Sequence, residues 1–294
     1  TDAQAVTELS NFGLELGVGC VALPNRASST VYDGIRAHCV ANRRIGLCAF
    51  ASGDTNTTVQ TTVSGWSQST DGIKSEYGHL AFYWPWVKVP DGAGGTRTIS
   101  PEGYVAAARA DATNASGPWR PFAGIVSSSR WVTGLNQTVT KAIGDSLDVY
   151  RINALRVIDG TVRIYGTRSA SADEVNWKYI SFRDTVNLVA STAEAALEQY
   201  TFSVIDARKT VFGKINSALT SIMEDIRSKG GLYEFIDSKG VPIDRGYSVE
   251  VSDAITSVAD LANGIIKARV GLRVNAVSDQ IQVTITKSTL TAGV

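Results

Sequence analysis

An unbroken run of apolar residues, "LAFYWPWV" from Leu80 to Val87, limits what this chain can fold into more than any other feature. A half-exposed strand alternates apolar and polar side chains, so a continuous run predicts a strand that is buried on both faces. Two further apolar runs, "LGVGCVA" (16–22) and "RIGLCAFA" (44–51), precede it, with helical periodicity between the runs. Alternation of this kind is typical of a parallel sheet that helices cover on both faces.

The rings in this run allow three interpretations: a stacking platform for a ligand, a membrane-interface belt, or a buried strand. No apolar segment reaches the ~20 residues that a transmembrane helix needs, and no basic amphipathic helix flanks the run. No candidate catalytic group accompanies the rings either. We therefore predict that Phe82, Trp84 and Trp86 are buried in the sheet. Tyr83 should contribute to the opposite face, and Pro85, which lacks an N–H, should lie at a strand edge or end.

Flanking residues predict where helices begin and where strands turn. Ser28 or Ser29 can cap a helix through "TVYDGIRAHCVAN", and Asp54 can cap the next helix. Asp159-Gly160 lies between two β-rich segments. This dipeptide predicts a hairpin with a type I′ turn.

The pattern changes beyond about residue 170, where two long amphipathic helices follow one another and short strands come after them. Apolar residues at helical spacing in the second helix predict one buried stripe, made of Val211, Ile215, Leu219, Ile222 and Ile226. Gly230-Gly231 supplies the stop signal. The sequence therefore predicts an α/β first domain over residues 1–169 and an α+β second domain over residues 170–294.

Composition and motifs disfavour several classes of function. The formal net charge is +0, whereas a nucleic-acid-binding domain normally carries a basic excess. The two histidines, His38 and His79, stand beside no plausible nucleophile, and no spacing suits a metal site. We predict no catalytic residue, no cofactor and no metal. Cys20, Cys39 and Cys48 lie in apolar contexts and are predicted to be buried, reduced thiols, which indicates synthesis in the cytoplasm.

Several segments, taken in chain order, resemble the tail sheath proteins of contractile phage tails and related contractile injection systems. These segments are Tyr83–Asp91, Pro101–Ala106, Arg109–Asp111, Gly117–Gly124, Arg163–Arg168, Trp177–Ile180 and Asp260–Gly264. Each motif is short, and their order and spacing together carry a resemblance that covers nearly the whole chain.

The resemblance implies a subtilisin-like α/β first domain without protease function and an α+β C-terminal domain that links subunits. Many copies would form stacked rings or a helical sheath around an inner tube, and their rearrangement would drive the tube into a target cell. The implied partners are further copies of the chain, the inner tail tube protein, and baseplate and tail terminator proteins, with neither nucleic acid nor membrane. The implied location is a virion tail assembled in the bacterial host cytoplasm.

Two alternatives remain open at this point: another virion structural protein such as a baseplate component, and, less favoured, an α/β hydrolase-like enzyme. The sequence also departs from the family pattern. A Pro-Ala-Glu that usually lies near the position of residues 277–279 is absent, and the family has a large N-terminal part with an extended arm. We therefore expect a chain truncated at its N-terminus, monomeric or weakly associated in isolation, with one sheet edge unfilled.

Two segments of the second domain are candidate contacts with other proteins. In "GIIKARVGLRV", strand alternation places Lys267, Arg269 and Arg273 on one face. A solvated strand face is the plain interpretation, and contact with an acidic patch on the inner tube or on a neighbouring subunit is the functional one.

The second segment lies near the C-terminus, after a predicted linker at residues 275–279. Alternation in "DQIQVTITKSTL" predicts a terminal strand that pairs within its own domain or is donated to the sheet edge of a neighbour. This predicted subunit-linking strand comprises Gln280, Ile281, Gln282, Val283, Thr284, Ile285 and Thr286.

Overall fold

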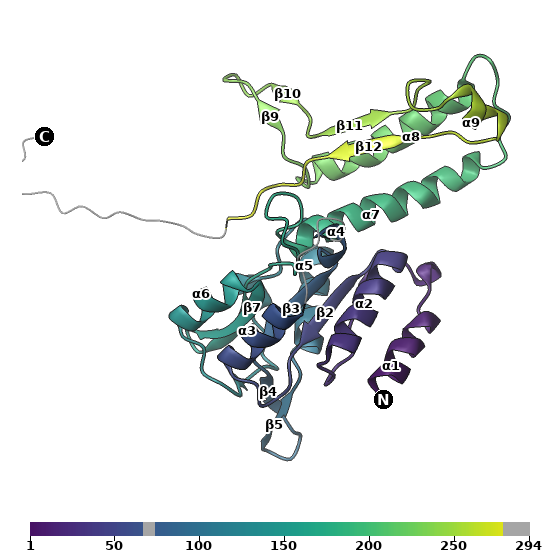
Figure 1. Ribbon diagram of the computed structural model, residues 1–294. Coiled ribbons are helices and arrows are strands. Elements are labelled where there is room, and N and C mark those ends of the chain that lie inside the picture. The colour runs from purple at the N-terminus through teal and green to yellow at the C-terminus, as the bar shows by residue number, and fades with distance from the viewer. Residues whose placement is uncertain (67–73, 279–294) are drawn as a thin grey trace, which may run out of the picture.

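The fold is seen in a computed structural model that describes residues 1–66 and 74–278 (Figure 1). The first elements are α1 (Asp2–Glu8), β1 (Cys20–Val21), α2 (Ser29–Asn42), β2 (Ile45–Ala49), α3 (Asn56–Gly65), α4 (Lys74–Tyr77), β3 (Leu80–Trp84), β4 (Val87–Pro90), β5 (Thr96–Ile99), α5 (Glu102–Ser116), β6 (Gly134–Leu135), α6 (Lys141–Val149), β7 (Ile152–Ile158) and β8 (Thr161–Tyr165). The later elements are α7 (Ile180–Leu197), α8 (Thr210–Ser228), β9 (Phe235–Ile236), β10 (Pro242–Asp244), β11 (Tyr247–Glu250), α9 (Val258–Ala262) and β12 (Arg269–Leu272).

A five-stranded sheet in the order β1-β2-β3-β7-β8 forms the centre of the first part, which we call the α/β body (residues 1–179). Its first four strands are parallel and β8 is antiparallel to β7. Helices α2, α3 and α6 pack their apolar side chains against one face of the sheet, and α5 packs against the other. The prediction of a parallel-rich sheet covered on both faces is therefore confirmed.

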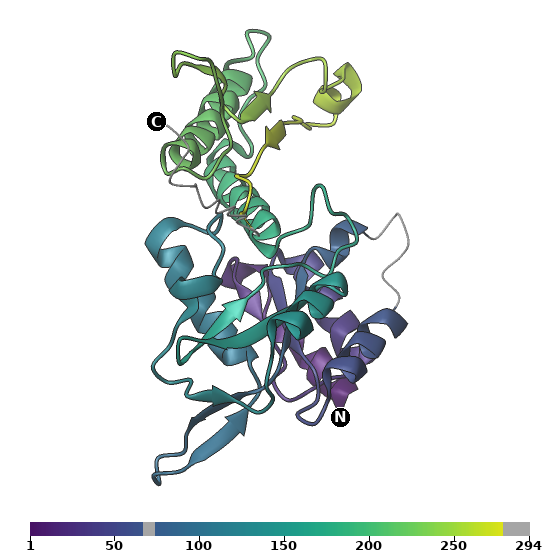
Figure 2. The ribbon, with the colours of Figure 1, turned by 90° about the vertical axis from the view of Figure 1, so that its left-hand side faces the viewer.

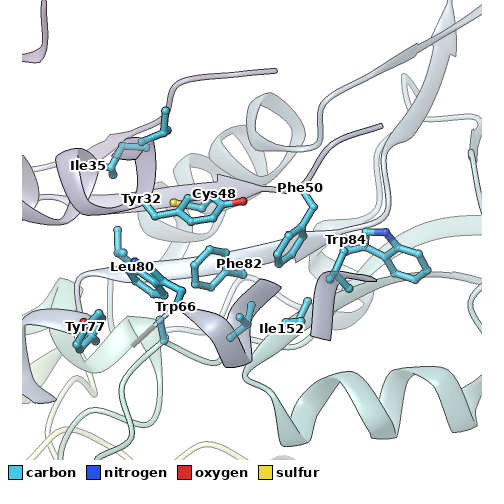
Figure 3. Close-up of a cluster of buried hydrophobic side chains, with 14 of the residues drawn as sticks. Tyr32, Ile35, Cys48, Phe50, Trp66, Tyr77, Leu80, Phe82, Trp84 and Ile152 are labelled. Atoms are coloured by element: carbon cyan, nitrogen blue, oxygen red, sulfur yellow. The ribbon is translucent and has the colours of Figure 1, made fainter. Parts of the chain in front are cut away.

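The aromatic run is buried within this sheet, as predicted. Phe82 and Trp84 belong to the core on the α2–α3 face, whereas Tyr83 belongs to the core on the α5 face. Tyr32 of α2 meets the Phe82 ring edge-on with centroids 5.0 Å apart (Figure 3). Trp86, just after β3, is also buried and donates its indole N–H to a backbone carbonyl at 2.7 Å. The rings therefore build the core, where aromatic pairs add to the burial of apolar area.

Local sequence signals correctly predicted one helix cap, one hairpin turn and one strand end. Ser28 caps α2 by accepting the N–H of Val31 at 3.3 Å. Asp159 and Gly160 both have positive φ, at 51° and 74°, as the predicted type I′ turn between β7 and β8 requires. Pro85 lies between β3 and β4, so its prediction is confirmed as well.

Two boundary predictions are wrong, and side-chain hydrogen bonds explain both. Thr55, not Asp54, caps α3, because the Asp54 carboxylate instead accepts the N–H of Ala51 in the preceding turn. The strand predicted over residues 16–22 shortens to Cys20–Val21, and Leu16 is 62% exposed in a 3₁₀ turn. The Arg44 guanidinium donates hydrogen bonds to the carbonyls of residues 12, 13 and 17. These bonds hold the segment outside the sheet.

The thiol predictions are confirmed for two of the three cysteines. Cys39 and Cys48 are buried, and Cys20, in the edge strand β1, is half-buried. All three are free thiols. Burial is the main reason why the pKa values of all three are raised, so the thiolate form is disfavoured.

Helices α7 and α8 form the predicted amphipathic pair. The stripe of α8 faces inward as expected: Val211, Ile215, Leu219 and Ile226 are buried and Ile222 is half-buried. Gly230 ends the helix region with a φ of 74°. Helix α7 bridges two cores, because Ile180 packs in the α/β body and Val189 packs with Met223 of α8. Figure 2 shows this helix running from the lower part of the molecule into the upper part.

Glu102 at the start of α5 predicts a pH-dependent stability. Its side chain is 1% exposed, accepts a hydrogen bond from the Ser100 hydroxyl, and has its pKa raised by burial from 4.5 to about 7. A raised folded-state pKa contributes stability below about pH 4.5 that is lost as the pH rises through about 7. We expect the free energy of unfolding of the wild type to fall by up to about 3 kcal/mol across this window. Glu102→Gln should not show this fall, because glutamine does not ionise. Urea unfolding at pH 5 and pH 8 measures it, and equal pH dependence in both proteins would contradict it.

Candidate functional site: a two-stranded sheet with open edges

Strands β11 and β12 form a two-stranded antiparallel sheet beside α8 (Figure 1), in the segment where the sequence predicts subunit contacts. The register pairs Tyr247 with Leu272 and Val249 with Val270. These four apolar side chains pack against the cluster of Met223 and its neighbours on α8. Because strand side chains alternate, the remaining residues of both strands lie on the other face. The sheet therefore has one half-buried apolar face and a second, more polar face.

Glu224 anchors this sheet to α8. Its carboxylate accepts the Tyr247 hydroxyl at 2.5 Å, the Arg227 guanidinium at 2.6 Å and the Arg245 guanidinium at 2.8 Å. These donors, Tyr247 first, lower the pKa of Glu224 to about 2. Sequence reasoning missed this residue, because it sits on a polar helix face beside Asp225. No local pattern links it to a tyrosine 23 positions later.

The outer edges of β11 and β12 carry no further strand within residues 1–66 and 74–278. An open edge exposes a row of backbone N–H and C=O groups that can pair with another chain. An edge that no further strand covers is a site for strand addition. The prediction that one edge stays unfilled remains a prediction, because residues 279–294 lie outside the described part.

Each residue of the predicted basic row forms an ion pair with a carboxylate of its own chain. The N–O distances are 2.7 Å for Lys267–Asp260, 3.4 Å for Arg269–Glu250 and 3.0 Å for Arg273–Asp244. Arg269 lies in β12, Arg273 follows it, and Lys267 precedes it. Exposed pairs of this kind contribute little to stability. The contacts favour a solvated strand face, and contact of this row with another protein stays a prediction.

The chain leaves β12 beside the C-terminal end of α8. Val274 forms a β-bridge with Leu232, and the Asn275 side-chain amide donates to the carbonyl of Gly230 at 2.5 Å. Ser278 is the last residue that the structure describes. The predicted subunit-linking strand, Gln280–Thr286, therefore lies outside the described residues.

The two histidines hold structural positions. His79 Nδ1 lies 2.8 Å from the carbonyl oxygen of Arg44, and burial lowers the pKa of His79 to about 4. His38 contacts Asn42 and the Arg44 guanidinium. In the part of the chain that the structure describes, no cluster of three or more His, Cys, Asp or Glu could hold a metal ion. No helix there is long and apolar enough to cross a membrane.

Neither a protein-family model nor a curated protein matches this sequence. Solved structures share its fold. A chain in the six-fold symmetrised baseplate of the anti-feeding prophage (AFP) matches with a TM-score of 0.74 and 19% identity over 98% of this chain and 73% of that one. The contracted AFP helical sheath gives 0.72 and 18% over 97% and 74%. The contracted PVC sheath complex, from an extracellular contractile injection system, gives 0.71 and 17% over 92% and 70%. The predicted resemblance is thus confirmed at the level of the fold.

Proposed function

We propose that this chain, which has the fold of the sheath proteins of contractile injection systems, is a structural subunit of a contractile tail sheath. Many copies polymerise around an inner tube, and their rearrangement drives the tube into a target cell. The observation that carries the proposal is the match to sheath assemblies over nearly the whole chain. A packing helix that carries a two-stranded sheet with open edges suits a protein that is linked to its neighbours.

We assign residues 1–169 to a subtilisin-like, non-catalytic domain and residues 170–294 to a domain that links subunits. Separate apolar cores support a division into two domains, although Ala170 and Ile180 still belong to the cores of the five-stranded sheet. Two cores lie on the faces of the five-stranded sheet, and two others lie among α7, α8, β11 and β12. The bridging helix α7 would carry movement of one domain to the other.

The link itself is the strand Gln280–Thr286, donated to an open edge of the β11–β12 sheet of a neighbouring copy. Backbone hydrogen bonds would hold it, and its alternating apolar row would fix its register. Residues 275–279 would be the linker between the donated strand and the donor. Such a link survives rotation of the subunits, because the paired strand need not move with its own body.

The remaining partners follow from the proposed role: an inner tail tube protein, baseplate proteins and a tail terminator. The protein would be part of a virion tail that is assembled in a bacterial cytoplasm. A baseplate component is the second candidate, because one of the matches comes from a baseplate structure. The role is structural rather than catalytic. A serine-reactive probe that labelled one site stoichiometrically would contradict that statement.

Electron microscopy tests the proposed function. Full-length protein produced together with its inner tube protein should form long hollow cylinders around the tube. Closed rings without cylinders would favour the baseplate role. Protein that stays dispersed in the presence of tube at every concentration would overturn both roles.

A further inference from the structure

An exposed apolar segment precedes β1, an edge strand of the five-stranded sheet, and is held by Arg44, the residue before β2. Phe12, Leu14 and Leu16 are each more than a third exposed, and their segment runs directly into β1. The Arg44 guanidinium holds it by donating to backbone carbonyls of residues 12, 13 and 17 at 2.6, 2.7 and 3.1 Å. The buried cation thus fixes the segment with its apolar side chains outward. We call Phe12, Leu14, Glu15 and Leu16 the β1-side patch.

A second exposed apolar segment lies beside the β8 edge. Ile125 is 73% exposed, Trp131 is 63% exposed, and the guanidinium of Arg130 lies 4.9 Å from the centroid of the Trp131 ring. Val126, in the same segment, is also exposed. We call Ile125, Val126, Arg130 and Trp131 the β8-side patch.

Hydrogen bonds fix the second segment along the outer edge of β8 and close that edge. The Ser127 hydroxyl oxygen accepts the N–H of Ile164 at 2.9 Å. The Tyr104 hydroxyl lies 2.5 Å from the Ser127 carbonyl and 3.1 Å from the Val162 carbonyl. Because the N–H of Ile164 and the carbonyl of Val162 on this edge are already bonded to side chains, these two groups are not free to pair with a strand of a neighbour. A partner at this edge would meet the apolar and charged side chains of the patch instead.

The two patches belong to opposite sides of one sheet: the first leads into the edge strand β1, and the second is bonded through Ser127 to the other edge strand, β8. Three strands separate β1 from β8, and Figure 1 shows α1 and β7 on opposite sides of β2 and β3. The patches cannot meet within one chain. They are complementary in charge, because Glu15 and Arg130 have opposite signs and neither forms an ion pair among the residues that the structure describes.

We propose that the β1-side patch of one copy docks on the β8-side patch of the next copy, with Glu15 facing Arg130 across the contact. Each copy offers both patches, so the contact is heterologous and continues into a ring or a helix. The apolar side chains supply the buried area, and the charge pair fixes orientation. This lateral contact rests on the proposed sheath function and names a second surface for it. It is separate from strand donation at the β11–β12 sheet.

Charge reversal in the full-length chain tests the contact. Glu15→Lys and Arg130→Glu should each weaken self-association about tenfold, because each places like charges opposite one another. The double variant carries both reversals in every copy and should recover most of the loss, since the pair is restored with its signs exchanged. Trp131→Ser should weaken association by a similar factor through lost apolar contact. Sedimentation equilibrium over a concentration series measures all four.

Matched controls separate the contact from general effects of charge and surface. Asp111→Lys makes the same charge change at an exposed position on α5, and Val175→Ser removes an exposed apolar side chain outside both patches. Both should associate like the wild type. A double variant no better than the single reversals would overturn the proposal, and so would wild-type protein without concentration-dependent association.

The outcomes distinguish this inference from the proposed function. Wild-type cylinders that form equally well with either reversal would remove the lateral contact and leave the sheath function standing. Association that depends on both patches, in protein that never forms cylinders with the tube, would keep the contact and remove the sheath function.

Discussion

Deletion of Gln280 to Val294 should abolish sheath polymerisation and leave the α/β body folded. The deletion removes the strand proposed to link neighbours, and the sheet body draws its core from residues that end before α8. Electron microscopy with the inner tube protein should find no cylinders. Near-ultraviolet circular dichroism should keep the signal of the buried rings, since Trp66, Trp84 and Trp86 lie far from the deletion in sequence.

A shorter deletion supplies the matched control. Removing only residues 287–294 keeps the predicted strand and should allow cylinders to form. Normal cylinders from the longer deletion would rule the strand out as the connector. Loss of cylinders in both variants would place the link in the last eight residues instead of the strand.

Arg109→Met should lower the free energy of unfolding by about 3–5 kcal/mol, because it leaves a buried carboxylate without its partner. Arg109 on α5 donates to both carboxylate oxygens of Asp184 on α7, at 2.8 and 2.6 Å. Both side chains are buried, so water cannot replace the lost donor. The pair joins the bridging helix α7 to the sheet body. Urea unfolding followed by circular dichroism measures the loss.

Two further variants make this prediction specific. Replacing both partners, Arg109→Met with Asp184→Leu, should recover most of the stability, since no unpaired charge is then buried. Lys141→Met breaks an exposed pair with Asp145 and should cost less than about 1 kcal/mol. If Arg109→Met cost no more than Lys141→Met, the buried pair would not stabilise the attachment of α7.

The sequence alone determined the elements whose signals are local. A strand made of a continuous apolar run is stable only when both of its faces are buried. Strands β2 and β3 were therefore predictable from "RIGLCAFA" and "LAFYWPWV". The α8 stripe and the Asp159-Gly160 turn were predictable because helical periodicity and positive φ are properties of neighbouring residues. The order of short motifs was enough to indicate the family fold.

The tertiary structure alone decided which distant residues meet. Arg44 donates hydrogen bonds to carbonyls about 30 positions earlier, in a segment that was predicted as a strand and is an exposed 3₁₀ turn. Glu224 meets Tyr247, and the predicted basic row finds carboxylates of its own chain. Sheet order, which places β1 and β8 at opposite edges, also follows from packing. Sequence periodicity reports which face of an element is apolar, but the partner of each side chain depends on how elements pack, because hydrogen bonds and ion pairs require atomic contact.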